Sequence, residues 1–400
     1  MSEPSQTTPS KDRSRIRWFV RAAALAIAIV LLWPARDTNF AAMVPGLSPF
    51  VLLGTRMQTL NGLLAKPLAL LIGGVVLVRP RWFCRWLCPL GLCTEGASRL
   101  GRRWGRRSVK SIPLGQWILW LTLGGALLGW PLLLWLDPLA IFASLFSLTS
   151  FHSVPSALLM ALPALAILLV SLAWPGLWCG RLCPLGAMQD VLSRPMQRWR
   201  RRKDSSSNSD LPLARRAVLG AVVGAASASL LRPIAASATR PIRPPGARDE
   251  SKFLAACVRC GNCIRVCPTQ IIEPDLGGHG LASLLTPKLR FEKNYCVENC
   301  VRCTYVCPTG ALTHLKHGGI KRFVQLGRPK VDMNLCLLSE DRECSECRRW
   351  CPYDAIRYVF SETEYCLIPQ IDPKKCNGCG ACEMACPVKP KKAIVVVPLD

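Results

Sequence analysis

Residues 257–268 read CVRCGNCIRVCP, four cysteines at the spacing C-x2-C-x2-C-x3-C followed by a proline. This is the spacing of bacterial ferredoxins, in which the first three thiolates hold three corners of a [4Fe–4S] cube and the fourth ligates the cube of a partner motif. The proline ends the local helix and turns the chain away. The stretch therefore predicts one half of a two-cluster ferredoxin unit.

Three further cysteine quartets follow, each ending in Cys-Pro, and the four motifs start 39, 40 and 40 residues apart. The last motif has the spacing of the first, whereas the first gap holds three residues in the second motif and seven in the third. Sixteen thiols in four matching frames favour iron–sulfur clusters over zinc. Residues 251–400 are thus predicted to form an α+β ferredoxin-like domain with four [4Fe–4S] clusters. The predicted ligands are Cys257, Cys260, Cys263, Cys267, Cys296, Cys300, Cys303, Cys307, Cys336, Cys344, Cys347, Cys351, Cys376, Cys379, Cys382 and Cys386.

The spacing leaves open which motifs share their fourth cysteines. A nested arrangement, first motif with fourth and second with third, is preferred, because the widened gaps of the second and third motifs suggest a special inner pair. Sequential pairing is the alternative, and the even period of about 40 residues does not decide between them.

The first half of the chain has a different composition. The chain of 400 residues has a net charge of +26, 22 cysteines and only 4 histidines. Half of all its residues are apolar. This content excludes a disordered chain and a small disulfide scaffold. Apolar stretches at 16–34, 60–78, 114–136 and 154–176 predict four membrane spans, since about 20 residues of helix cross a bilayer. None of them contains histidine, so no bis-histidine haem is expected.

Basic residues cluster before the first stretch, after the second and after the fourth, so the positive-inside rule places both ends of this 1–203 module in the cytoplasm. The basic run at 200–203 is accordingly interpreted as a topology signal, and no nucleic-acid partner is expected. No Walker A loop or dinucleotide fingerprint is present.

The second and fourth stretches end in the same motif, C-x3-C-P followed by Leu-Gly. The pairs are Cys84/Cys88 and Cys179/Cys183, 95 residues apart, within two units of the form helix, outer turn, helix, motif. An axis along the membrane normal would bring both pairs together as one four-thiolate site. A fifth iron–sulfur cluster is the favoured occupant, with zinc or unliganded thiols as alternatives. Cys93 and Cys366 remain unassigned.

Residues 204–250 are interpreted as a linker. Arg215 and Arg216 open a mildly apolar segment that ends in Ala-x-Ala at 236–238, as in a twin-arginine export signal. A fifth span (a signal anchor) or a basic-flanked linker is the alternative reading of the same segment.

These motifs resemble two families. Residues 1–203, with both C-x3-C-P pairs, look like the NapH/MauN membrane proteins, and residues 213–400 look like the NapG/MauM ferredoxin-type proteins. The resemblance implies a fused quinol-dehydrogenase component of the bacterial inner membrane that passes electrons from the membrane quinone pool to a periplasmic redox enzyme or small carrier. It also implies an alternative role in redox maturation of a periplasmic enzyme.

The four-cluster domain is expected in the periplasm rather than the cytoplasm. About 30 Å of hydrocarbon would then separate it from the C-x3-C-P site, a gap that a diffusing quinol could bridge. Asp137 and His152, at the outer side, are candidates for a quinone site because they can exchange protons. A helix-capping role for Asp137 is the alternative.

Overall fold

The computed structural model describes residues 11–33, 41–54, 60–106, 114–149, 154–202, 211–237, 240–315, 323–340, 342–363 and 365–399. Side chains are not described for several residues inside these ranges, among them Arg215 and Arg216. His152 and Ala238 lie outside the described residues.

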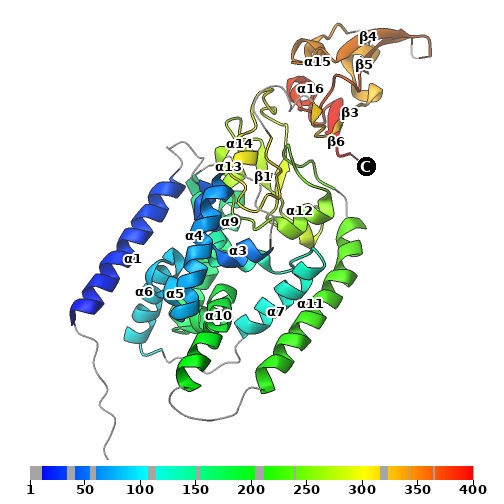
Figure 1. The fold of residues 1–400 in the computed structure, drawn as a ribbon. Helices are drawn as coiled ribbons and strands as arrows, with labels where there is room; N and C mark the ends of the chain where they lie inside the picture. Colours follow the sequence, from blue (N-terminus) through cyan, green and yellow to red (C-terminus); the bar gives the residue numbers. More distant parts are fainter. Residues whose placement is uncertain are drawn as a thin grey trace, which may run out of the picture.

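The first half of the chain is a helical bundle (Figure 1). Its helices are α1 (Lys11–Leu32), α2 (Met43–Gly46), α3 (Pro49–Gly54), α4 (Leu60–Val78), α5 (Trp82–Trp86), α6 (Pro89–Arg103), α7 (Leu114–Leu127), η2 (Leu134–Leu136), α8 (Pro138–Ser144), η3 (Leu145–Thr149), α9 (Val154–Ala173), η4 (Trp178–Leu182), α10 (Pro184–Arg202) and α11 (Leu211–Ser237). The core between them contains Phe50, Leu90, Leu139 and Leu185, each 1% exposed or less.

The second half has short helices and two-stranded antiparallel sheets, as expected for a ferredoxin-like chain. Strand β1 (Ile272–Pro274) pairs with β2 (Pro287–Leu289), β3 (Arg328–Val331) with β6 (Ile394–Val397), and β4 (Ile356–Ser361) with β5 (Cys366–Ile371). The helices are α12 (Glu250–Ala256), α13 (Asn262–Val266), η5 (Leu281–Ser283), α14 (Arg302–Tyr305), η7 (Met333–Leu335), η8 (Leu337–Glu340), α15 (Glu346–Arg349) and α16 (Ala381–Ala385).

One of the four expected spans is much shorter than its apolar stretch. Helix α7 ends at Leu127 instead of near residue 136, because Gly129 takes a positive φ of 76° and the Trp130 amide folds back to donate to Gly125 O. Pro131 then prevents a return to helix. The apolar residues that follow form the turn η2, which lies on the end of the bundle.

Within the described residues, one helical segment is both long and apolar enough to cross a membrane, Ser156–Ala173 of α9. Shorter apolar segments lie at Pro67–Val78, Leu114–Leu127, Pro138–Leu148 and Ala217–Leu230. The expected four-span bundle is therefore not confirmed. Lys66 and Pro67 in α4 and the early end of α7 explain why two of the predicted spans fall short.

The segment interpreted as an export signal forms most of α11, which packs along α7. Glycines allow the two backbones to approach: a Cβ on Gly124 would lie 2.1 Å from Ala221 O, and one on Gly224 would lie 2.3 Å from Leu121 O. Small residues at such positions are typical of closely packed helix pairs in membranes. Helix α11 is thus an integral part of the bundle.

This packing predicts that Gly224→Ala destabilises the protein, by about 1–3 kcal/mol, because a methyl group does not fit against the α7 backbone. The matched control is Gly74→Ala in α4, where a Cβ would have no atom within 4 Å. That change should leave the thermal midpoint of the full chain in detergent unchanged or raise it. Equal midpoints for both variants would contradict the α7–α11 contact.

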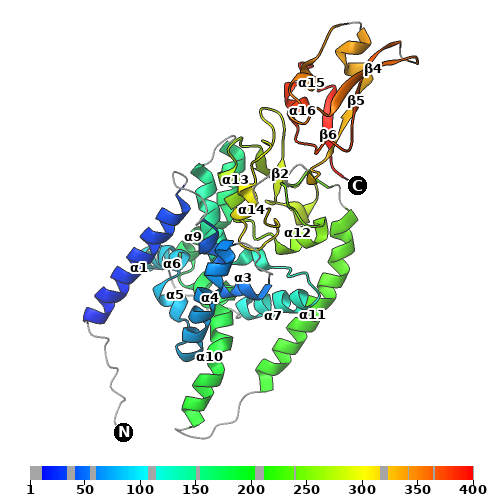
Figure 2. The same ribbon diagram turned by 45° about the horizontal axis from the view of Figure 1, so that its top comes forward.

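The ferredoxin half docks on one end of the bundle, away from the C-x3-C-P motifs (Figures 1 and 2). Asn262 Nδ2 donates to Ala41 O at 3.0 Å, and Arg265 Nη1 donates to Leu32 O at 2.6 Å. Helix α7 connects the two ends, since Gly115 at its start lies against the backbone of Cys183 and Trp130 beyond its end joins the core around Phe253.

Candidate iron–sulfur centres

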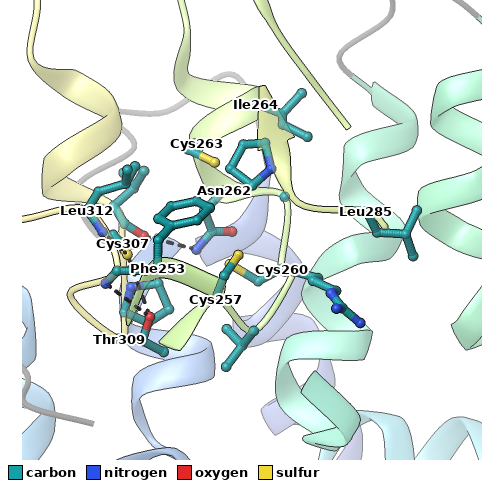
Figure 3. A pocket seen from close by; sticks show the side chains of 17 residues that line it. Phe253, Cys257, Cys260, Asn262, Cys263, Ile264, Leu285, Cys307, Thr309 and Leu312 are labelled. Carbon is teal, nitrogen blue, oxygen red and sulfur yellow. Dashed lines mark hydrogen bonds between the residues drawn. The ribbon is translucent and has the colours of Figure 1, made fainter. Parts of the chain in front are cut away.

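The first three cysteines of the first motif face the fourth cysteine of the second (Figure 3). Cys257, Cys260, Cys263 and Cys307 line one small cavity, which Phe253, Ile264, Leu312 and other apolar side chains enclose. Helices α13 and α14, from the two motifs, pack together. We call these four cysteines the first set.

The same arrangement recurs in the last two motifs. Cys336, Cys344, Cys347 and Cys386 line a second small cavity with Pro387, and helices α15 and α16 pack together. Cys351, the last cysteine of the third motif, is close enough to Cys376, Cys379 and Cys382 to affect their ionisation. These groups are the third and fourth sets.

Twelve of the sixteen ferredoxin cysteines belong to these three sets. The remaining four, Cys296, Cys300, Cys303 and Cys267, are therefore the second set. The motifs therefore pair sequentially, first with second and third with fourth, and the preferred nested pairing is wrong. The widened gap of the third motif has a local cause: it holds η8, which packs on β5.

Each motif positions its thiols by local backbone geometry. Gly261 and Gly380 have φ values of 73° and 83°, and each precedes the single helical turn that carries the third cysteine. The turn ends at an extended fourth cysteine, Cys267 or Cys386, whose direction the next proline maintains. At Gly380 a Cβ would also lie 2.2 Å from the Phe291 ring, so no other residue fits.

The donor chemistry fits [4Fe–4S] clusters. Burial raises the pKa of Cys260 and of Cys379 to about 12, so these thiols would stay protonated at neutral pH without a cationic partner. Bound iron supplies that partner and favours the thiolates. All 22 cysteines are free of disulfides, and no group of His, Cys, Asp or Glu within the described ranges converges closely enough for a single metal ion.

The two C-x3-C-P pairs also lie close together in the structure. Each of the thiols of Cys84, Cys88, Cys179 and Cys183 is near enough to the other three to interact with them electrostatically. Cys88 and Cys183 are the N-caps of α6 and α10, where Gly91 N donates to Cys88 Sγ at 3.3 Å and Gly186 N to Cys183 Sγ at 3.4 Å.

The repeat shows in the hydrogen bonds that cross between its two units. Thr94, six residues after Cys88, lies with its Oγ1 3.1 Å from Cys179 Sγ. Gln189, six residues after Cys183, donates from Nε2 to Cys84 Sγ at 3.0 Å. Each unit therefore holds the first cysteine of the other, as the expected two-fold relation requires.

Charged residues frame the same site. Arg81 pairs with Asp190 and donates to Cys179 O at 3.3 Å, while Glu95, the repeat equivalent of Asp190, pairs with Arg17 and Arg21. Cationic groups beside buried thiolates favour a cluster of net negative charge.

Comparison with protein families supports iron–sulfur binding in both halves. Models of a 4Fe–4S binding domain match residues 67–107 and 156–205, which contain the two C-x3-C-P motifs, and residues 369–391. A 4Fe–4S dicluster domain matches residues 256–311, the first and second motifs together. That match agrees with sequential pairing.

Curated relatives name the family. The methylamine utilization ferredoxin-type protein MauM of Methylobacillus flagellatus is 36% identical over 190 residues, which cover 46% of this chain and 78% of the relative. The chain belongs to the ferredoxin-type 4Fe–4S proteins. The ferredoxin-type protein NapF of Escherichia coli is 33% identical over 38% of this chain and 83% of its own length, and NapG of Haemophilus influenzae is 32% identical over 40% and 60%. No solved structure matches.

This ferredoxin-type protein is accordingly an iron–sulfur electron-transfer protein related to MauM, NapF and NapG. The relatives cover part of the chain, and they do not show the expected fusion with a NapH/MauN-like half. The number of bound clusters remains the prediction made from the cysteines.

The structure gives Asp137 a capping role. Its side chain is fully buried, accepts from Leu139 N and Ala140 N at 3.0 and 3.1 Å, and is bonded to Ser48 Oγ in the corresponding outer turn of the first unit. Its quinone role stays a prediction, as does that of His152. Arg215 and Arg216 lie in the first turns of α11.

Sequence reasoning missed one polar pair in the ferredoxin half. His279 Nδ1 lies 2.9 Å from Oδ2 of Asp275, which is fully buried. The four-residue spacing in a glycine-containing loop was the only signal. Of the unassigned cysteines, Cys93 lies in α6 against the core of the bundle, and Cys366 is buried in β5 near Cys336.

The hydrogen bonds that cross between the two units should affect the midpoint potential of a cluster at the C-x3-C-P site. Gln189→Leu and Thr94→Val each remove a donor to a thiolate sulfur, and such bonds stabilise the more negative reduced state. The midpoint potential should fall by on the order of 30–60 mV per variant, since 59 mV corresponds to about 1.4 kcal/mol for one electron. Ser98→Ala in α6, whose hydroxyl bonds Ser171 O, is the matched control and should not shift it. Equal potentials in all three variants would contradict these bonds.

Proposed function

We propose that this protein is a membrane-bound quinol-dehydrogenase component that carries electrons through its clusters to a periplasmic redox enzyme or small carrier. One observation carries the proposal: the thiolate sets are arranged in a line, starting at the bundle. The unit of the first and second sets rests on the bundle, and Cys296 N of the second set donates to Cys379 O of the fourth at 2.9 Å. Helices α15 and α16, which belong to the last two motifs, lie at the end furthest from the bundle, near β4 and β5 (Figure 2).

The far end of this line is suited to an exit. Trp350, which follows α15, Phe360 in β4 and Tyr365 just before β5 are 46%, 57% and 80% exposed. Aromatic residues of this kind are enriched where proteins bind partners. Electrons that enter beside the bundle would leave there.

Membrane insertion is supported by apolar side chains that point away from the bundle. Leu71 of α4, Leu169 of α9 and Val222 of α11 are 62%, 65% and 60% exposed. The basic residues gather at the end that carries the C-x3-C-P motifs. With that end in the cytoplasm, α11 would cross the bacterial inner membrane and deliver the ferredoxin half to the periplasm.

The similarity to MauM favours a second candidate, redox maturation of a periplasmic enzyme. The two candidates differ in what the clusters do during turnover. In the first, quinol reduces them and a soluble acceptor reoxidises them continuously. In the second, quinol leaves them oxidised, and a partner enzyme's cofactor stays immature without this protein.

The test uses the purified full chain in lipid vesicles. We expect menadiol to reduce the clusters, measured as bleaching of their visible absorbance and as new EPR signals. A reporter fused after residue 400 should be active only on the periplasmic side. No bleaching with menadiol would overturn the quinol role, and a cytoplasmic reporter would overturn the periplasmic placement.

A further inference from the structure

A cavity lies where the ferredoxin half meets the bundle. It measures about 550 Å³, within the range of small-molecule sites. One wall is the turn after α7, and the other is formed by α12, the start of the first motif and residues 279–282, which run into η5. Its lining residues are Trp130, Pro131, Leu132, Leu134, Trp135, Leu254, Ala255, Cys257, Arg259, His279, Gly280, Leu281 and Ala282.

Most of this lining is apolar and aromatic, so the cavity suits a flat, apolar ring. Apolar side chains typical of a membrane surface are exposed in the same two segments: Leu281 at the start of η5, which lines the cavity, is 86% exposed, and Leu127 at the end of α7 is 84% exposed. Tryptophans at the end of an apolar helix, here Trp130 and Trp135, mark the level of lipid headgroups. A molecule dissolved in the bilayer could therefore enter from the side.

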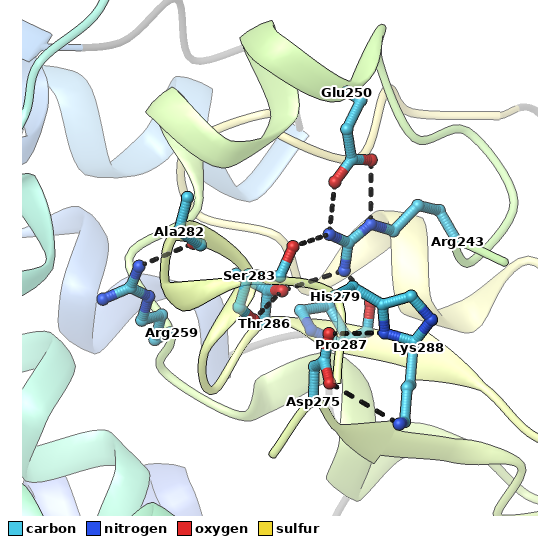
Figure 4. Close-up of polar contacts among 10 residues, drawn as sticks. All are labelled: Arg243, Glu250, Arg259, Asp275, His279, Ala282, Ser283, Thr286, Pro287 and Lys288. Carbon is cyan, nitrogen blue, oxygen red and sulfur yellow. Dashed lines mark hydrogen bonds and ion pairs between the residues drawn. The ribbon is translucent and has the colours of Figure 1, made fainter. Parts of the chain in front are cut away.

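His279 is the histidine in the cavity wall, and its ring is oriented. Asp275 Oδ2 lies 2.9 Å from Nδ1, and Lys288 Nζ lies 3.5 Å from Asp275 Oδ1 (Figure 4). A carboxylate partner favours the tautomer with the proton on Nδ1 and leaves Nε2 as an acceptor. His279 can thus take a proton from a bound hydroxyl group.

Arg259 connects the walls. Its guanidinium lies 4.9 Å from the Trp135 ring centroid, and its Nη2 donates to Ala282 O at 3.0 Å. Its buried Nε has no hydrogen-bond partner within the described residues. Buried donors are seldom left unpaired, so a polar ligand oxygen would satisfy it.

Cys257 lines this cavity and also the cavity of the first set. A ring bound here would lie beside a ligand of the first cluster, which is the start of the line of thiolate sets. We propose that this cavity is the hydroquinone-binding site, with His279 as the proton acceptor, Asp275 as its positioning residue and Arg259 as a donor to a ring oxygen. The inference rests on the proposed quinol-dehydrogenase function and locates its site at His279 instead of Asp137 or His152.

The protons and electrons of the proposed hydroquinone oxidation can all be assigned to acceptors. One hydroquinone loses two O–H protons and two electrons and becomes the quinone. One proton goes to Nε2 of His279 and the other to solvent, and the two electrons reduce two [4Fe–4S] clusters by one electron each. The chain's own residues bind the ring, orient it and remove the proton.

Two readouts test the site in the full chain in lipid vesicles. An azido-naphthoquinone, activated by light, should label peptides that contain residues 130–135 or 279–282, as mapped by mass spectrometry. His279→Gln should keep this labelling, because glutamine can still bond Asp275, but should slow cluster reduction by menadiol about 10²–10⁴-fold. Ala282→Trp, which fills the cavity, should abolish the labelling.

His314→Gln is the matched control, because His314 does not line the cavity. Its ring packs edge-on against Tyr305, with 4.2 Å between the two ring centroids. It should leave labelling and rate unchanged. Wild-type reduction by menadiol with labelling elsewhere, or with a normal rate in His279→Gln, would overturn this site and leave the proposed function standing. Failure of menadiol to reduce the wild-type protein would overturn the proposed function itself.

Discussion

Replacing Cys307 by alanine should remove the iron of one cluster, and adding Cys260→Ala should remove no more. Both thiols line the cavity of the first set, so the second substitution acts on a cluster that is already lost. Cys307→Ala combined with Cys347→Ala should instead cost two clusters, because Cys347 belongs to the third set. Iron and acid-labile sulfide per full-length chain measure the outcome.

Nested pairing predicts the reverse. Cys307 would then share a cluster with Cys347, so that double variant would lose one cluster and the Cys260/Cys307 variant two. Cys93→Ala is the control, since this thiol lies in α6 outside every set and its loss should leave the iron content unchanged. EPR of the reduced variants separates a lost cluster from one that has only lost a single iron.

The cluster ligands could be predicted from the sequence because ligand spacing is a local property. In the first and fourth motifs, three cysteines within seven residues must lie close together, whatever the rest of the chain does. The exchange of fourth cysteines is a tertiary contact, in which Cys307 reaches the first motif across the packing of α13 on α14. The even period of the motifs carries no information about that contact.

The C-x3-C-P site could also be predicted from the sequence, because two identical motifs at the ends of equivalent helices imply a symmetry axis. The residues that hydrogen-bond to its cysteines could not be predicted. Thr94 and Gln189 occupy equivalent positions, but one is a hydroxyl and the other an amide, so the repeat is hidden at the level of residue type. His279 was missed for a related reason, because its role depends on a bundle surface distant in sequence.

The sequence contains a signal for the end of α7 that the predicted span 114–136 does not take into account. Gly129 followed by Trp130 and Pro131 is a helix-stop signal, and it explains why the apolar stretch to residue 136 is not one span. Residues 204–250 are interpreted above as a linker, and the structure shows what the end of that segment contacts. This end is hydrogen-bonded to the ferredoxin half, where Leu289 N donates to Ile242 O at 2.7 Å and Thr313 N donates to Gly246 O at 2.6 Å.

Arg243, in that segment, is expected to be among the most sensitive positions for stability. Its guanidinium and the carboxylate of Glu250 are each 8% exposed and form two hydrogen bonds, while Nη1 donates to Thr286 Oγ1 at 2.9 Å and to Pro287 O at 2.7 Å (Figure 4). The guanidinium also lies 4.6 Å from the centroid of the Phe253 ring, beside the first set.

Arg243→Met keeps the volume of the stem but leaves the Glu250 carboxylate buried without its partner. Loss of one partner of a buried ion pair costs about 3–5 kcal/mol. The denaturant midpoint for loss of cluster absorbance should fall accordingly in the full chain. Arg290→Met is the matched control: Arg290 is 52% exposed and pairs with Glu273 and Glu292 at the surface, so its loss should cost less than about 1 kcal/mol.

A second substitution tests whether the cost comes from the stranded carboxylate. Arg243→Met with Glu250→Gln removes both charges, so it should recover a large part of the lost stability, and each single variant should be less stable than the double. If Arg243→Met alone does not fold, the double variant still reports on the same pair. A double variant no more stable than Arg243→Met would show that the hydrogen bonds to Thr286 and Pro287, not the ion pair, hold residues 240–249 on the ferredoxin half.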